Sequence, residues 1–301
     1  MKHVVILIVL ALVSTFPAIA QGGGQISVTG CGISKKAYMG NAIKAYAAKV
    51  GARPRLSGGG AQKGIRLAAG GKVNVGATCR HRLVDDSDNL YPAEKNAKLI
   101  PVGWDALVAI THKSNPVKNL SSAQLKDIFE GKITNWSEFG GNDMPITVMT
   151  RSGSTSGVGY MARLMIFGSP DYQYKAKGRV FKSTGPLEKN VSATPGAIAL
   201  DGVSSARMVD VAIIGIDGFQ ATKPNIASGD YPFFRPLYVA VNATKQDPMA
   251  EGFVDFLLGA EGQKIISDSD TVNLAEGATL PAKWKAKTRG FGRAWREDAF
   301  N

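Results

Sequence analysis

The stretch QISVTGCG, from Gln25 to Gly32, begins the folded part of this sequence. Its first residues alternate in polarity and are β-branched, which is typical of a strand, and the glycines after them are typical of a tight turn. Ala37–Val50 has apolar residues at helical spacing and ends before Gly51, which predicts a helix. The alternation of strand and helix then continues and predicts parallel βαβ units. The next expected elements in this alternation are a strand at Arg53–Leu56, a helix from about Lys63 to Ala69 and a strand at Val73–Ala77.

Loops that follow parallel strands meet at one edge of a sheet, because the crossovers are right-handed. Open α/β sheets bind ligands at that edge. A further loop, Arg151–Gly157, follows a strand expected at Ile146–Thr150 and opens a helix expected at Val158–Phe167. Small residues and free N–H groups at helix N-termini suit an anion, and Arg151 adds a planar fork of donors. The loops expected to converge are Gly30–Lys35, Ser57–Gln62 and Thr78–Arg82.

The whole chain has the composition of an ordinary globular protein. It has 301 residues, 44% of them hydrophobic and 20% charged, with a net charge of +12. This length is near the limit of a single core, so two lobes are expected. Residues beyond Asn273 show no clear pattern. The other expected elements are strands at Trp104–Thr111, Val211–Ile216 and Phe234–Val241, and helices at Ser121–Phe129 and Pro248–Ile266.

Residues 1–20 have the features of a secretory signal peptide. Lys2 precedes an apolar run from Val4 to Val13, and Ala18–Ala20 is a small-residue cleavage site. We expect cleavage after Ala20 and a periplasmic or secreted mature chain that is not embedded in the membrane. An uncleaved N-terminal anchor is the alternative, although the apolar run is too short to span a bilayer. Cleavage lowers the net charge to +11, because the segment contains one lysine and no acid.

The sequence gives little support for catalysis. After export only His81 and His112 remain, and neither lies in a nucleophile-elbow, zinc-helix or triad pattern. The glycine-rich loops match neither a Walker A loop nor a dinucleotide fingerprint. We therefore expect a binding protein that is not an enzyme and needs no cofactor.

Several stretches resemble the periplasmic phosphate-binding proteins of ABC uptake systems, over nearly all of residues 25–280. The most specific part runs from Gly103-Trp104-Asp105-Ala106 through Asn115-Pro116 to Ile128-Phe129-x-Gly131-x-Ile133-x-Asn135-Trp136. The other stretches are Gly30-x-Gly32 with Ser34, Gly64-Ile65, Val73–Ala77, Arg151-x-x-Ser154-Thr155-Ser156-Gly157, Pro195–Ile198 and Arg235–Tyr238.

The resemblance implies an α/β protein of two lobes, each a mostly parallel sheet flanked by helices, with two crossing strands as a hinge. Lobe 1 is expected at residues 25–107 plus 235–280, lobe 2 at 108–234, and a basic aromatic tail at 281–301. Such proteins close on a small oxyanion and deliver it to a membrane permease. We expect a monomer whose partners are the anion and the permease, and no nucleic acid.

Carried over residue by residue, the family's ligand site is altered here. Arg151 matches, whereas Ala61 stands for a serine, Cys79 for an Asp or Ser, and Gly153 for an Asp. The two missing carboxylates predict weak discrimination between protonated phosphate and fully ionised anions such as sulfate. The candidate ligand-binding residues are Gly32, Ser34, Lys35, Ala61, Gln62, Cys79, Arg80, Arg151, Ser154, Thr155, Ser156 and Gly157.

Cys31 and Cys79 follow two strands that are neighbours in this fold. They are compatible with a disulfide between the loops, with two thiols that have no role, or with a thiolate site for a soft metal or metalloid assisted by His81. No other metal site is expected.

Two further functions remain open. The altered ligand residues fit an extracytoplasmic structural or interaction protein that has kept the fold but lost the ligand site. The two cysteines fit a metal or metalloid sensor. In the tail 281–301, six basic and two acidic residues give a net charge of +4. This tail is either a C-terminal helix packed on lobe 1 or a contact surface for an acidic partner.

Overall fold

The computed structural model describes residues 24–294 except 86, 88 and 154. The expected signal peptide at residues 1–20 and the candidate ligand residue Ser154 lie outside the described residues, as does the end of the basic tail from residue 295. Within the described part of the chain, no helix is long and apolar enough to cross a membrane.

The strands pair in the order β2-β1-β3-β10-β4-β8-β6-β7, and β9 pairs with both β4 and β5. β1 runs parallel to β2 and β3, and β6 runs parallel to β7 and β8. Their bounds are β1 Gln25–Gly30, β2 Arg53–Ser57, β3 Val75–Thr78, β4 Ala97–Thr111, β5 Asn119–Leu120, β6 Thr147–Arg151, β7 Gly178–Phe181, β8 Ala197–Gly202, β9 Ala212–Ile216 and β10 Phe234–Asn242.

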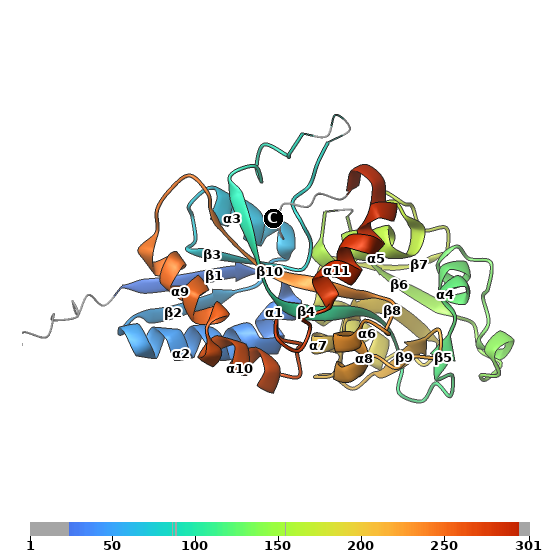
Figure 1. Cartoon of the computed structure of the whole chain (residues 1–301). Coiled ribbons are helices and arrows are strands. Elements are labelled where there is room, and N and C mark those ends of the chain that lie inside the picture. The colour runs from blue at the N-terminus through green and yellow to red at the C-terminus, as the bar shows by residue number, and fades with distance from the viewer. Residues whose placement is uncertain (1–23, 86, 88, 154, 295–301) are drawn as a thin grey trace, which may run out of the picture.

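The 15-residue strand β4 joins the two halves of this path. From Ala97 to Ala106 it pairs antiparallel with β10, and from Leu107 to Thr111 it pairs with β8 and β9. The chain returns beside it, since the Leu107 amide donates to the Phe233 carbonyl at 2.9 Å just before β10 begins. Two mostly parallel sheets are thus joined at two crossings, which confirms the two-lobed α/β fold (Figure 1).

Helices cover the two sheets, and clear capping residues bound several of them. Ser121 and Gln124 form a capping box at the start of α4, and Gly51 ends α2 in the left-handed conformation. The bounds are α1 Gly32–Ser34, η1 Lys35–Met39, α2 Gly40–Val50, α3 Ala61–Ala69, α4 Ser122–Phe129, η2 Trp136–Phe139, α5 Gly157–Phe167, α6 Thr184–Ser192, α7 Val203–Ala206, α8 Lys223–Ser228, α9 Pro248–Leu258, α10 Ala260–Asp268, α11 Leu280–Thr288 and η3 Arg289–Ala294.

Some expected bounds are wrong. The helix expected at Ala37–Val50 begins at Gly32, through a π-helical turn at η1. The helix expected at Pro248–Ile266 is two helices, because Gly259 adopts an extended conformation between α9 and α10. The strand expected at Trp104–Thr111 is the second part of the longer β4, and the strand expected at Val73–Ala77 begins only at Val75.

The described part of the tail forms a C-terminal helix, which is one of the two alternatives given in the sequence analysis. In α11, Leu280, Trp284 and Thr288 are buried, and the Trp284 ring lies 5.9 Å from the Phe234 ring of β10. Phe291 of η3 also packs against Trp284, with ring centroids 6.1 Å apart. The described part of the tail is therefore packed against the start of β10.

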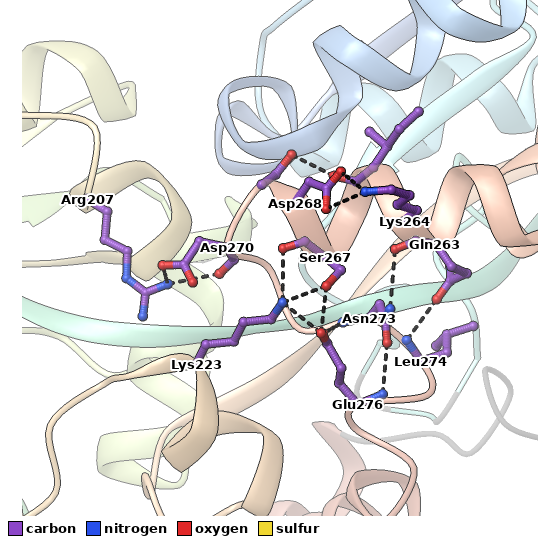
Figure 2. A network of polar contacts seen from close by, with 12 residues as sticks. Arg207, Lys223, Gln263, Lys264, Ser267, Asp268, Asp270, Asn273, Leu274 and Glu276 are labelled. Carbon is purple, nitrogen blue, oxygen red and sulfur yellow. Dashed lines mark hydrogen bonds and ion pairs between the residues drawn. The ribbon is translucent and has the colours of Figure 1, made fainter.

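A polar network connects α7 and α8 with the chain that follows α10 (Figure 2). Lys223 of α8 donates to the Ser267 carbonyl at 2.9 Å and pairs with Glu276 at 2.8 Å. Arg207, just after α7, pairs with Asp270. Since α7 and α8 belong to residues 108–234 and α10 to residues 235–280, these contacts tie the two expected lobes together beside β4.

Candidate functional site

The N-termini of α1, α3, α5 and α6 meet at the carboxyl ends of the parallel strands. A Cβ added to Gly157, the first residue of α5, would stand 3.0 Å from the Ala61 Cβ of α3 and 2.4 Å from the Cys79 sulfur. A Cβ on Gly32 of α1 would lie 3.6 Å from the Thr184 hydroxyl of α6. These helix ends direct their positive dipole ends toward one place, which favours an anion.

Arg151 ends β6 at this place and is buried. Its Nη1 donates to the Thr184 hydroxyl at 2.7 Å, and its Nη2 donates to the Lys182 carbonyl at 3.1 Å. Among the described residues its Nε has no hydrogen-bond partner. A buried guanidinium with a free donor beside converging helix N-termini is suited to an oxyanion.

A buried carboxyl pair, Asp201 and Glu188, lies next to Arg151, and the sequence analysis does not identify it. Glu188 accepts hydrogen bonds from Lys36 and Ser205. Both oxygens of Asp201 lack a hydrogen-bond partner among the described residues. Burial raises the pKa of Asp201 well above its usual value, Glu188 adds to this shift, and Arg151 opposes it. Asp201 is the last residue but one of β8, so the apolar run Ala197–Leu200 followed by an acid was the available signal.

A second buried arginine, Arg235 of β10, lies near the two cysteines of the site. Its Nη2 donates to Asp105 of β4 at 2.9 Å, and both side chains are fully buried. Its Nε and Nη1 have no partner among the described residues. The thiol groups of Cys79 and Cys31 lie close enough to contribute to the raised pKa of Arg235. The resemblance pointed to Arg235 as part of a motif, without assigning it to the site.

The two cysteines lie together at the centre of the site. Their sulfurs are 2.8 Å apart, and both residues are buried as free thiols. Cys31 precedes α1 and Cys79 follows β3, so the pair links the first loop, Gly30–Lys35, with the third loop, Thr78–Arg82. Among the described residues, no group of three or more His, Cys, Asp and Glu side chains is arranged to hold a metal ion.

Arg80 and His81 connect the third loop with both sides of the site. The Arg80 guanidinium makes a bidentate pair with the buried Glu94, at 2.8 and 2.9 Å, and its Nε donates to the Thr155 carbonyl at 2.9 Å. The His81 Nε2 lies 3.0 Å from the Tyr160 hydroxyl of α5. Arg80 is thus engaged in holding loops together. His112, the other histidine considered, lies 2.7 Å from the Ser114 hydroxyl at the end of β4, away from these residues.

The other candidates divide into two groups. The Ser34 hydroxyl is buried and has no hydrogen-bond partner among the described residues, whereas Lys35 is exposed. The Gln62 amide lies 3.1 Å from the Thr155 hydroxyl, across the contact between α3 and α5. The Ser156 hydroxyl caps α5 by accepting from the Gly159 amide at 3.0 Å. The structure therefore brings Gly32, Ser34, Ala61, Cys79, Arg151 and Gly157 around one place, with Gln62, Arg80, Thr155 and Ser156 at its border.

Known proteins match this fold and most of this chain. The model of a family described as a PBP superfamily domain matches residues 17–261. The phosphate-binding protein PstS of Bacillus subtilis is 26% identical over 265 residues, which cover 85% of this chain and 83% of that protein. A crystal structure of a putative phosphate ABC transporter substrate-binding protein from Clostridium perfringens, with bound phosphate, has a TM-score of 0.73 and 29% identity. It covers 83% of this chain and 99% of its own.

A phosphate transport receptor from Vibrio cholerae, 24% identical with a TM-score of 0.63 over 82% of this chain and 99% of its own, shares the fold. The match to the family model, over residues 17–261, extends over both sheets and all four converging helices. These matches confirm the resemblance expected from the sequence, and the chain belongs to the PBP superfamily.

Proposed function

We propose that this protein is an exported solute-binding protein that captures phosphate, or a related tetrahedral anion, between two lobes for an ABC uptake system. The observation that carries the proposal is the buried Arg151, whose Nε is unpartnered among the described residues where the helix N-termini meet. The Bacillus subtilis relative is named as a phosphate-binding protein, and the similar Clostridium perfringens structure contains bound phosphate. Delivery to a permease and a monomeric state are part of the proposal.

The proposed lobes are residues 25–107 plus 235–280 and residues 108–234. Several contacts cross between them at the site, including Arg80 to the Thr155 carbonyl and His81 to the Tyr160 hydroxyl. Lys36 of η1 also pairs with Glu188 of α6. Hinge closure on a ligand would make such contacts, and release would break them.

The choice of anion depends on the Asp201 carboxyl. Burial raises the pKa of this carboxyl well above its usual value, and Glu188 adds to the shift, so the protonated form is favoured more strongly than in an exposed Asp. A protonated carboxyl donates a hydrogen bond to any oxyanion and does not repel sulfate. This supports the prediction from the sequence that phosphate is only weakly preferred over sulfate.

Titration calorimetry with phosphate, sulfate, arsenate and molybdate between pH 6 and pH 8 tests the proposal. We expect binding of phosphate, with sulfate within about tenfold of it, because Cys79 and Gly153 stand where the resemblance expects carboxylates that would repel sulfate. Phosphate binding far tighter than sulfate throughout this range would contradict the weak discrimination. No heat with any of the anions would contradict anion capture and favour an interaction protein that has kept the fold.

A further inference from the structure

The contact between Cys31 and Cys79 is tighter than packing alone produces. Their sulfurs are separated by 2.8 Å, which is inside the van der Waals contact of two sulfur atoms. Cys31 directly follows β1 and Cys79 directly follows β3, and these two strands pair in parallel. The Cys31 amide donates to the Ala77 carbonyl at 2.8 Å, so the backbone holds the two loops side by side. Formation of a bond between these sulfurs needs little movement of the chain.

The charges around the pair distinguish its two thiols. Contact with Cys79 lowers the pKa of Cys31 to about 7, although burial acts in the other direction, and Arg235 lowers it further. The pKa of Cys79 is raised by the same contact and by burial. The charged and titratable groups that face the pair are Arg235 of β10, Asp105 of β4, Arg151 of β6 and Tyr38 of η1. The lowered pKa of Cys31 and the raised pKa of Cys79 favour a single negative charge, shared by the two sulfurs, on the reduced pair above about pH 7.

We propose that Cys31 and Cys79 form a reversible disulfide that controls the strength of the anion site. The anion half of this proposal rests on the proposed function, whereas the disulfide itself does not. In the reduced protein a thiolate competes with the bound anion for the donors of Arg235 and Arg151. The disulfide is neutral, so its formation leaves both guanidinium groups to the anion.

The chemistry is thiol–disulfide exchange with a small-molecule disulfide as oxidant. The Cys31 thiolate attacks one sulfur of the oxidant, forms a mixed disulfide and releases one thiolate. Cys79 loses its proton to solvent and attacks the Cys31 sulfur, which forms the internal disulfide and expels the second thiolate. Two protein thiols are oxidised, and one small disulfide is reduced to two thiols. A small dithiol reverses both steps.

Access to the sulfurs requires separation of the lobes. Cys31 is 3% exposed and Cys79 is 1% exposed, and Gly157 at the start of α5 lies over the Cys79 sulfur. An anion that holds the lobes closed should therefore slow exchange at the pair.

Intact mass measurement tests the disulfide without any anion. The mature chain is unfolded and refolded in reduced and oxidised glutathione, quenched in acid and compared with chain kept in dithiothreitol. We expect the oxidised product to be lighter by about 2 Da and to resist alkylation. Two alkylatable thiols after refolding under oxidising conditions would overturn the disulfide.

Phosphate titration of the two redox forms tests the control of the anion site. At pH 8 we expect the oxidised form to bind phosphate at least about tenfold more tightly than the reduced form, since one buried charge is removed. At pH 5.5, where Cys31 is protonated, the two forms should agree within about twofold. Phosphate itself titrates near pH 7, so the forms are compared with each other at each pH.

The control is the Cys31→Ser, Cys79→Ser double variant, which is uncharged at both pH values. Its affinity should change with pH as that of the oxidised form does, and reductant should not affect it. Equal phosphate affinities of the oxidised and reduced forms at pH 8 would overturn the proposal that the disulfide regulates the anion site. Absence of phosphate binding in every form would overturn the proposed function, while the mass shift would still decide the disulfide.

Discussion

Arg151 and Asp201 lie at the same level on two neighbouring parallel strands. β6 and β8 pair with Thr147 opposite Ala197 and Met149 opposite Ala199, and the same offset places Arg151 opposite Asp201. Both side chains are buried, and each shifts the pKa of the other. The resemblance expects a carboxyl two residues beyond the arginine, where Gly153 stands. Here a different strand supplies a carboxyl to that arginine.

The first prediction concerns Arg151. Arg151→Lys keeps the positive charge and loses the planar fork, so it removes at least one charge-assisted hydrogen bond to the anion. We expect phosphate affinity to fall at least about tenfold. Calorimetry measures this loss, and Arg179→Lys, on the exposed part of the neighbouring β7, is the matched control. Phosphate affinity within twofold of the unchanged protein would remove Arg151 from the site.

A second prediction follows from the raised pKa of Asp201. A carboxyl whose pKa is higher in the folded than in the unfolded protein stabilises the fold below its unfolded pKa, and this contribution is lost as pH rises through the folded pKa. Asp201→Asn keeps the shape and cannot ionise. We therefore expect the variant to be more stable than the unchanged protein at pH 8, with the difference shrinking toward pH 4.

Thermal unfolding across this pH range, without anion, measures the Asp201 effect. The control is Asp268→Asn, an exposed residue that pairs with Lys264 on α10. A stability difference for Asp201→Asn that does not change between pH 4 and pH 8 would show that the carboxyl does not titrate as its burial implies.

The parts of the fold that the sequence predicted are those with strong local signals. The β1 strand alternates, the helix expected at Ser121–Phe129 begins beside Ser121, and Gly51 ends its helix. The sequence analysis assigned no elements between Gly168 and Val211, where the structure has β7, α6, β8 and α7. β7 is short and mostly exposed, so it lacks the apolar pattern on which a prediction depends.

The sequence analysis identified those residues of the candidate site that lie at the ends of strands it had recognised. Cys79 follows β3 and Arg151 is the last residue of β6, and the structure brings them close together. Asp201 and Thr184 were missed because Asp201 lies within β8 and Thr184 follows β7, and neither strand had been assigned. Arg235 was missed for another reason. It lies at the beginning of an antiparallel strand, and only the pairing of β10 with β4 brings this end to the site.

A third prediction concerns Glu94, which holds the third loop through Arg80 and the Leu83 amide. Burial alone would raise the pKa of Glu94, but the hydrogen bond and charge of Arg80 outweigh it, so the pKa is lowered. Its stabilisation is therefore complete above the unfolded pKa and is lost as pH falls through the folded pKa. Glu94→Gln leaves a buried, poorly compensated arginine, and we expect a loss of about 3–5 kcal/mol near neutral pH.

Urea unfolding at pH 7 and at pH 3.5 measures the loss for Glu94→Gln, which should be smaller at the lower pH. Glu261→Gln is the control, because the Glu261–Lys49 pair is exposed. We expect it to change stability by less than about 1 kcal/mol. Equal effects of the two substitutions would show that the buried pair contributes no more than the exposed one.

A fourth prediction concerns the contact of the Tyr160 hydroxyl with His81. If this contact forms when the lobes close, Tyr160→Phe should weaken phosphate binding about fivefold, the usual effect of one hydrogen bond. The unfolding temperature without phosphate should hardly change. Tyr172→Phe is the control, since that ring stacks on Phe167 within the same lobe at 3.8 Å. Lower stability with unchanged affinity would show that the contact persists in the open protein.

A final prediction concerns Lys287 of α11. Burial lowers its pKa to about 8, and its Nζ donates to the Pro232 carbonyl and lies 5.2 Å from the Phe234 ring centroid. An amine with a lowered folded pKa stabilises the fold above its unfolded pKa, and this contribution is lost as pH falls through the folded pKa. Relative to Lys287→Met, the unchanged protein should therefore gain stability as pH rises from about 8 toward about 10.5. Thermal unfolding from pH 7 to pH 10 measures this gain, with Lys283→Met as the control on the exposed part of α11. A constant difference between the two proteins over this range would mean that Lys287 keeps its charge at α11, and that its contact with the Pro232 carbonyl compensates for the burial.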